Sequence, residues 1–271
     1  MSCKIIAHRG ANKKAPQNTL PAFRLAVQEG ADGFETDVHL TKDGRAVICH
    51  NYTIDATSDG RGSIADYTFD ELRLFDFGSY FGEEFRGTPA PALEEFLEIA
   101  KSAALDVINI ELKSPKNRNY AVVGKTLDAV RAFGVLDRVV VSSFDPRLLR
   151  EVKAAEPRCK TGFLYPCSNP RTSGIVPSAL LCAKKIGADF IHPAYIMVSR
   201  ALVLAAHHMQ IGVNVWTVDD PRTTAFLLAC GVDGIITDCP LEVRTFAEAA
   251  KKNRSPEPGL FELPEKAPAR P

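Results

Sequence analysis

Short apolar runs alternate with longer amphipathic stretches along most of this chain. Each run is followed by a segment in which apolar residues recur at helical spacing. This alternation predicts strands that each lead into a helix, as in a parallel sheet. The predicted strands are 4–8, 33–38, 107–112, 139–143, 160–165, 188–192, 212–217 and 234–238, and the predicted helices are 19–29, 92–104, 119–134, 146–155, 175–186, 199–210, 220–230 and 241–252.

Eight strands, each followed by a helix, favour an α/β fold of the closed (β/α)8 TIM-type barrel class. The main alternative is an open doubly wound sheet, which shares the alternation. No GxGxxG motif opens any predicted helix, although that motif is typical of dinucleotide-binding open sheets. Helix signals agree with the division, since Thr19 can cap the first helix, Pro21 lies just inside it and Gly30 follows it. We therefore expect one barrel domain over residues 1–253.

A hairpin is predicted directly after the second strand. Residues 39–50 contain Asp43-Gly44, a hairpin turn signal, and the segment is too short for a parallel crossover. An antiparallel partner for the second strand follows. If the turn centres on Asp43-Gly44, His50 falls opposite Asp37.

Two further segments interrupt the alternation. Residues 51–91 are rich in glycine and aromatic side chains, which makes them too apolar for a disordered linker. They predict a small subdomain inserted over the barrel mouth. Residues 254–271 are rich in proline and charged residues and predict a flexible tail.

Composition excludes several classes of protein. Among the 271 residues, 33 Lys and Arg balance 33 Asp and Glu, so we expect no nucleic-acid partner, because such proteins usually carry a basic face. The seven cysteines form no CxxC pair, which favours reduced thiols in a cytoplasmic protein. No apolar run approaches the roughly 20 residues of a membrane-spanning helix, and Met1 runs straight into the first predicted strand, without room for a signal peptide.

Charged residues gather where the predicted strands end. His8 and Arg9 end the first strand, Glu35 and Asp37 the second, and Glu111 and Lys113 the third. Residues i and i+2 of a strand point to one face, and the carboxyl ends of barrel strands carry the active site. The sequence therefore predicts an active site built from these side chains.

The three carboxylates are hard oxygen ligands that suit Mg²⁺ or Ca²⁺, with water and substrate oxygens completing the shell. A structural network of ion pairs with Arg9 and Lys113 is the alternative interpretation. His8 and His50 could serve as general acid and base. Arg9 offers a fork for phosphate oxygens, and Lys113 a point charge.

Other candidate residues carry weaker signals. His207 and His208 lie in a predicted helix and are expected at the surface, while His39 lies just beyond a strand and is expected in solvent. His192 ends the sixth strand and could line the pocket. Trp216 is the only tryptophan, and it could pack in the core or form an apolar wall for a ligand at the barrel mouth.

With these residues in hand, the chain resembles the glycerophosphodiester phosphodiesterase family over roughly residues 4–250. Each motif is weak alone, but their order and spacing are highly specific. The motifs are His8-Arg9-Gly10, Pro16-Gln17-Asn18-Thr19, Glu35-Thr36-Asp37-Val38, Asp43-Gly44 with His50, Asp70-Glu71-Leu72, Pro91-Ala92-Leu93-Glu94-Glu95, Asn109-Ile110-Glu111-Leu112-Lys113, Val215-Trp216-Thr217-Val218 and Gly234-Ile235-Ile236-Thr237-Asp238.

The resemblance implies a TIM-type barrel that hydrolyses glycerophosphodiesters to sn-glycerol 3-phosphate and an alcohol. It also implies roles for the strand-end residues. Metal ligands would be Glu35, Asp37 and Glu111, acid/base histidines His8 and His50, and phosphate-binding residues Arg9 and Lys113.

Three positions depart from the family pattern. Gln17 replaces the usual acid before Asn-Thr, Asn51 replaces an aspartate after the second histidine, and Ala56 replaces a common arginine of the insertion. Gln17 removes a negative charge near Arg9, which could alter metal preference or substrate. The core catalytic set is retained, so activity is expected.

Two other functions compete with this reading. A lipid-directed activity of the lysophospholipase D or sphingomyelinase D kind would need an apolar path for the acyl chain, which the aromatic insertion could supply. An inactive barrel could instead be retained as a phosphate-binding module. The sequence leaves open which histidine is the acid, and whether water or the substrate's own hydroxyl attacks phosphorus.

Overall fold

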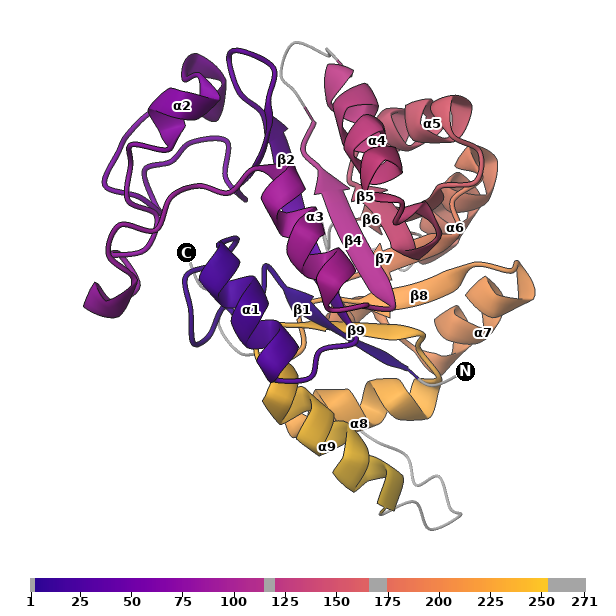
Figure 1. Ribbon diagram of the computed structural model, residues 1–271. Helices are drawn as coiled ribbons and strands as arrows, with labels where there is room; N and C mark the ends of the chain where they lie inside the picture. The colour runs from indigo at the N-terminus through magenta and orange to yellow at the C-terminus, as the bar shows by residue number, and fades with distance from the viewer. Residues whose placement is uncertain (1–2, 115–119, 166–174, 253–271) are drawn as a thin grey trace.

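The computed structural model describes residues 3–114, 120–165 and 175–252. Within these residues eight parallel strands form a closed barrel, because β1 pairs with β2 on one side and with β9 on the other (Figure 1). This confirms the predicted barrel and excludes the open sheet. The barrel strands are β1 Lys4–His8, β2 Gly33–Leu40, β4 Val107–Leu112, β5 Val139–Ser143, β6 Lys160–Tyr165, β7 Phe190–Pro193, β8 Gly212–Val215 and β9 Gly234–Thr237.

Helices connect the strands and cover the outside of the barrel (Figure 1). The predicted cap of the first helix is present, since the side chain of Thr19 accepts a hydrogen bond from Ala22 N, and Asp145 and Asp220 cap later helices in the same way. None of the helices in the described residues is both long and apolar enough to cross a membrane. The helices are α1 Leu20–Gln28, α3 Leu93–Ser102, α4 Ala121–Phe133, α5 Pro146–Ala155, α6 Ile175–Ile186, α7 Arg200–His208, α8 Pro221–Cys230 and α9 Pro240–Lys252.

The apolar core lies between the barrel and its helices. Phe34 on β2 points outward and meets Phe23 of α1 and Phe96 of α3, with ring centroids 4.8–5.9 Å apart. All three rings are fully buried. Because side chains alternate along a strand, the same pattern that sends Phe34 into this core sends its neighbour Glu35 toward the barrel axis.

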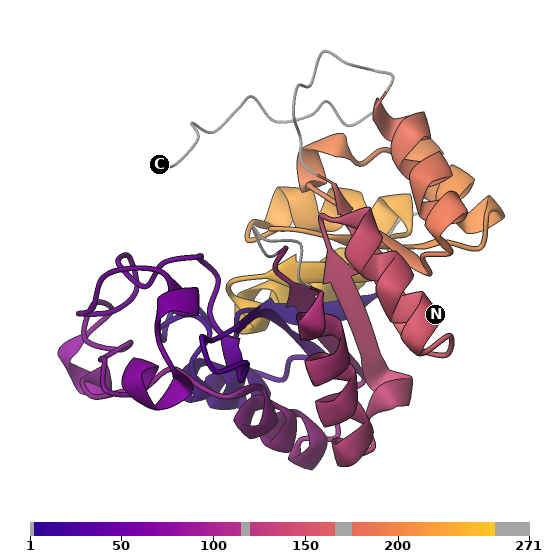
Figure 2. The same cartoon turned by 90° about the horizontal axis from the view of Figure 1, so that it is seen from above.

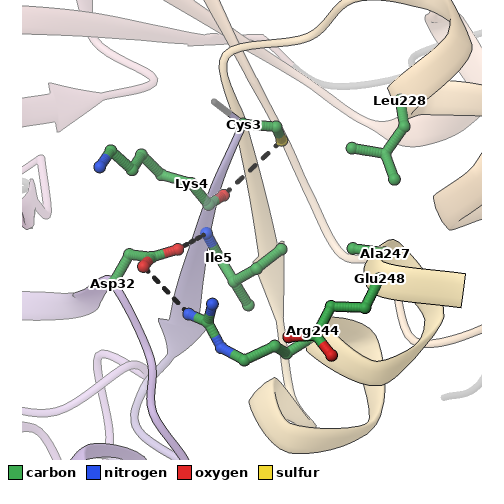
Figure 3. A pocket seen from close by; sticks show the side chains of 8 residues that line it. All are labelled: Cys3, Lys4, Ile5, Asp32, Leu228, Arg244, Ala247 and Glu248. Atoms are coloured by element: carbon green, nitrogen blue, oxygen red, sulfur yellow. Dashed lines mark hydrogen bonds and ion pairs between the residues drawn. The ribbon is translucent and has the colours of Figure 1, made fainter. Parts of the chain in front are cut away.

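The amino-terminal end of the barrel is held by a polar joint that lines a pocket (Figure 3). Asp32 accepts a hydrogen bond from Ile5 N at 2.8 Å and pairs with Arg244 at 3.0 Å. The contact joins β1, the turn before β2 and α9. It lies at the end of the barrel opposite the charged strand ends, and in TIM-type barrels that end serves stability rather than catalysis.

β3, Ala46–Ile48, pairs with β2 as the predicted antiparallel hairpin, but its register differs from the expectation by one residue. Val38 pairs with Ile48, and Cys49 N donates to Asp37 O, so Cys49 rather than His50 lies opposite Asp37. The reason is the turn. Thr41 pairs with Arg45 around a three-residue loop in which Gly44 adopts φ 76°, instead of the two-residue turn assumed from the sequence.

Residues 51–91 form a separate lobe attached to this hairpin (Figures 1 and 2). The lobe contains α2, Phe69–Leu72, and two short 3₁₀ turns, and it has an apolar core around Ile54, Ile64 and Phe77. Tyr80 Oη accepts a hydrogen bond from Gln17 N, and Tyr52 Oη donates one to Ser114 O. These bonds tie the lobe to loops after β1 and β4, at the carboxyl end of the strands. The predicted tail, 254–271, lies outside the described residues.

Candidate active site

Three carboxylates converge inside the carboxyl end of the barrel. Glu35 and Asp37 come from β2 and Glu111 from β4, and the parallel register sets Asp37 beside Glu111. One oxygen of each lies within 4.8 Å of the others, and all three residues are buried. The structure therefore brings together the three acids that the sequence nominated as metal ligands.

Two cations neutralise part of this charge. Lys113 Nζ lies 2.7 Å from Asp37 Oδ1 and 2.6 Å from Glu111 Oε1. Arg9 Nε lies 3.4 Å from Asp37 Oδ2, and Arg9 N donates to Glu35 Oε2. Three acids against two bases leave one formal negative charge in a buried site, so the ion-pair network alone does not balance the cluster.

The turn after β1 explains why Arg9 faces the carboxylates. Arg9 and Gly10 both take left-handed backbone angles, with φ 54° and 83°. A Cβ on Gly10 would stand 2.6 Å from the backbone of Ala22, so only glycine fits there. Gly10 thereby lets the chain turn tightly against α1 directly after His8-Arg9.

Burial raises the pKa of all three carboxyl groups, but the net pKa shifts differ in direction. Burial, with repulsion from Asp37 and Glu111, raises the pKa of Glu35 well above its usual value. Burial, with repulsion from Asp37, raises the pKa of Glu111 to about 7. Burial acts in the same sense on Asp37, but Lys113 and Arg9 outweigh it and lower its pKa. A cluster that otherwise takes up protons is a fitting site for a divalent cation, because the ion supplies the missing positive charge.

His8 and His50 lie at the same end of the barrel. His8 Nδ1 is 2.5 Å from Asp238 Oδ1, and its Nε2 is 3.9 Å from Glu35 Oε2. His50 Nδ1 meets Asn51 Oδ1 at 2.7 Å. Burial, together with the positive charges of Arg9 and Lys113, lowers the pKa of His50 to about 4, although Asp37 acts in the other direction.

His39 was expected in solvent, and that prediction is wrong. It lies within β2 and is buried, with its Nε2 3.3 Å from His50 O and its ring edge-on to Tyr52. The hairpin covers it, which the sequence alone did not indicate. His39 therefore supports the backbone that carries His50.

His192 and Trp216 occupy different levels of the barrel. His192 is fully buried beside Asn214 and has no partner for its Nδ1 among the described residues, so it lies in the interior and not in the open mouth. Trp216 is half-buried just beyond β8, donates to His192 O and packs edge-on against Phe144 at 5.9 Å. The predicted surface histidines, His207 and His208, are exposed on α7.

No individual role was assigned to Asn18 or Asp238 from the sequence, and Gln17 was named only as a departure from the family pattern near Arg9. Asn18 donates to Asp37 Oδ2 at 2.7 Å and accepts from Thr36, and Gln17 Oε1 accepts from Arg9 Nη1 at 2.5 Å. Asp238 contacts His8. A signal was present for each, since they belong to motifs at the ends of β1 and β9.

The comparisons with known proteins agree on one family. Residues 8–242 match the model of the glycerophosphoryl diester phosphodiesterase family. A glycerophosphodiester phosphodiesterase of Caldanaerobacter subterraneus subsp. tengcongensis is 38% identical over 89% of this chain and 96% of its own length. One from Bacillus altitudinis is 35% identical over 88% and 95%.

Solved structures show the same architecture. The glycerophosphodiester phosphodiesterase of Agrobacterium tumefaciens superposes with a TM-score of 0.77 at 27% identity, covering 90% of this chain and 100% of that one. An Oleispira antarctica phosphodiesterase, solved in complex with the product sn-glycerol-3-phosphate, gives 0.83 at 25% identity, covering 90% and 96%.

Proposed function

Because the chain belongs to the glycerophosphoryl diester phosphodiesterase family, whose members are hydrolases, we propose that it hydrolyses glycerophosphodiesters to sn-glycerol 3-phosphate and an alcohol, using a divalent cation and two histidines. The observation that carries the proposal is the buried cluster of Glu35, Asp37 and Glu111, with His8 and His50 at the same end of the barrel. The product complex of the Oleispira protein supports the glycerol phosphate specificity.

Glu35, Asp37 and Glu111 would hold the cation, which is Mg²⁺ or Ca²⁺ from the hard oxygen donors. Once bound, the ion supplies a Lewis acid that polarises a phosphoryl oxygen and offsets charge developing in the transition state. Asn18, by bonding Asp37 Oδ2, keeps that carboxylate turned toward its neighbours.

Arg9 is the phosphate-binding residue in this mechanism. Its Nη1 is held by Gln17, and the fork retains further N–H donors for phosphate oxygens. Lys113 lies between two carboxylates, so it acts mainly by balancing their charge and offers the substrate a point charge. Trp216, with Phe144 beside it, would give the organic part of the substrate an apolar wall.

His8 and His50 would move the protons. One removes the proton from the attacking hydroxyl, which belongs to water or to the glycerol moiety, and the other gives a proton to the leaving alkoxide. The buried cysteines Cys49, Cys159, Cys230 and Cys239 are free thiols, which supports work in the reducing cytoplasm. The relatives carry glycerophosphodiester names, so the lipid-directed alternative is not retained.

The proposal is tested by turnover of glycerophosphocholine, glycerophosphoethanolamine, glycerophosphoglycerol and a lysophospholipid, before and after chelation. We expect hydrolysis of at least one water-soluble diester, its loss with EDTA and its return with Mg²⁺ or Ca²⁺. Glu111→Gln should weaken binding of the ion in a calorimetric titration, while Asp106→Asn, which alters an exposed acid paired with Lys4, should not. Full activity after exhaustive chelation would refute the metal assignment.

A further inference from the structure

Asp238 lies directly beyond β9, beside His8 at the end of β1. Ala7 pairs with Thr237 in the parallel register. The residues that follow them, His8 and Asp238, therefore lie side by side at the mouth of the barrel. Nδ1 of His8 is 2.5 Å from Asp238 Oδ1, and Nε2 faces Glu35 Oε2 at 3.9 Å. The imidazole therefore spans the distance between Asp238 and the carboxylate cluster.

The carboxylate of Asp238 is fixed from several sides. Asn12 Nδ2 donates both to Asp238 Oδ1 and to His8 O, at 2.7 Å each. The backbone of Asp238 is also held, because its N donates to Asp219 Oδ1 and its O accepts from Lys13 N. The oxygen that meets His8 thus has a defined position before any substrate binds.

The hydrogen-bonding capacity of Asp238 decides which nitrogen of the His8 ring carries the proton. Burial tends to raise the pKa of Asp238, but the hydrogen bond and charge of His8 and the hydrogen bond from Asn12 bring it below its usual value. An ionised carboxylate only accepts hydrogen bonds, so His8 Nδ1 must carry the proton that lies between them. Nε2 is then the ring nitrogen that faces the site, 3.9 Å from Glu35 Oε2.

We propose that Asp238, assisted by Asn12, is a positioning residue that holds His8 in the Nδ1-protonated tautomer with Nε2 directed at the carboxylate cluster. A carboxylate that fixes the tautomer and orientation of a catalytic imidazole is established chemistry in other hydrolases. Within the part of the chain that the structure describes, His50 has no such carboxylate at its Nδ1, which meets the neutral amide oxygen of Asn51. The catalytic consequence rests on the proposed function, whereas the tautomer does not.

The tautomer can be measured directly on the full-length, cation-loaded protein. Long-range ¹H–¹⁵N spectra of the histidine-labelled protein report which ring nitrogen is protonated, and His8→Gln identifies the His8 signals among the six histidines. We expect the wild-type His8 to be protonated at Nδ1. Asp238→Ala should give a mixture of tautomers, whereas Asp238→Asn, whose amide oxygen can still accept from both donors, should keep the wild-type form. Asn12→Ala should give a partial shift, and it provides a second test if Asp238→Ala does not fold.

Kinetics supply the second measurement. We expect Asp238→Ala to lower kcat by roughly 100-fold, which lies between the effect of losing the orienting partner of a metal ligand and that of losing a triad aspartate. KM and calcium affinity should change less than about threefold, because the hydrogen bonds of Asp238 go to His8, Asn12, Asp219 and Lys13 and to none of the three clustered acids. Asp238→Asn should restore part of kcat. The matched control is Asp233→Asn, which alters a carboxylate–histidine pair on the surface, with His207, and should leave kcat unchanged.

Two results would overturn the inference. One is a wild-type His8 with no proton on Nδ1. The other is an Asp238→Ala protein with the wild-type tautomer and wild-type kcat. If the wild-type protein hydrolyses none of the diesters, the proposed function fails, and the tautomer comparison still decides the role of Asp238.

Discussion

Removing the charge of Lys113 should make the stability of this protein depend strongly on divalent cations. Lys113→Met keeps the length of the side chain but leaves Asp37 and Glu111 without their shared partner, 2.7 and 2.6 Å away. At an effective dielectric constant of about 20, each of these contacts has a gross Coulomb energy of about 6 kcal/mol. Desolvation offsets much of that, and breaking a buried pair by removing one partner costs about 3–5 kcal/mol.

The metal-free variant should therefore unfold at a temperature about 6–20 °C below wild type, taking about 2–4 °C per kcal/mol for a chain of this size. A divalent cation adds positive charge to the same carboxylates and binds only the folded state, so it should recover most of that difference. Circular dichroism melting curves in EDTA and in millimolar Mg²⁺ or Ca²⁺ measure both effects.

Lys153→Met is the matched control, because Lys153 pairs with Asp189 at 2.7 Å on the helix layer, away from the cluster. Its melting temperature should respond to the cation as wild type does. If Lys113→Met is no less stable in EDTA than this control, or gains no more from the cation than wild type, the electrostatic account of the cluster is wrong.

Three further outcomes follow from the site and the interior. His8→Ala and His50→Ala should each lower kcat by about 100-fold or more, the usual scale for a lost general acid or base, and a variant retaining over about a third of kcat would exclude that histidine. Gln17→Glu adds a negative charge beside Arg9 and should raise KM about 10-fold, because the new charge repels the substrate phosphate. The product inhibition constant should rise more, because the monoester product carries more negative charge than the diester. Unchanged values of both constants in steady-state assays would contradict this. Burial lowers the pKa of His192 to about 3, so the unfolded state binds a proton that the folded state does not between pH 6.5 and 3. Stability should fall as pH falls through that window by roughly 1.4 kcal/mol per pH unit, and urea unfolding at pH 7 and 5 should show a smaller fall for His192→Gln.

The barrel was predictable because its signals are local and repeated. Each strand and helix has its own periodicity, and caps such as Thr19 and Asp220 act within one turn. Boundaries were less exact. The sixth predicted strand was expected at 188–192 and is β7, Phe190–Pro193, because pairing with neighbouring strands, and not apolar character, decides where a strand begins.

The site was predictable where it follows from the alternation of side chains along a strand. Glu35, Asp37 and Glu111 converge because i and i+2 share a face and β2 and β4 are in register. The position of His50 depended on the turn, where Gly44 in the left-handed region shifts the pairing by one residue. The role of Asp238 could not be predicted from the sequence because its partner, His8, lies 230 residues earlier. The two residues become neighbours only when β9 pairs with β1.

The pairing of β9 with β1 has a consequence for how this protein is made. A nascent chain that has been synthesised through β8 already contains β2, β4 and all three clustered acids, but His8 still lacks the neighbour that orients it. Contacts of such long sequence separation form late, because loop closure must precede them. A ribosome-bound chain arrested before residue 234 should therefore hold the carboxylate cluster only in an open sheet, and catalytic competence should arise only after β9 has been synthesised and has paired with β1. Hydrolytic activity during translation would in this way report closure of the barrel itself.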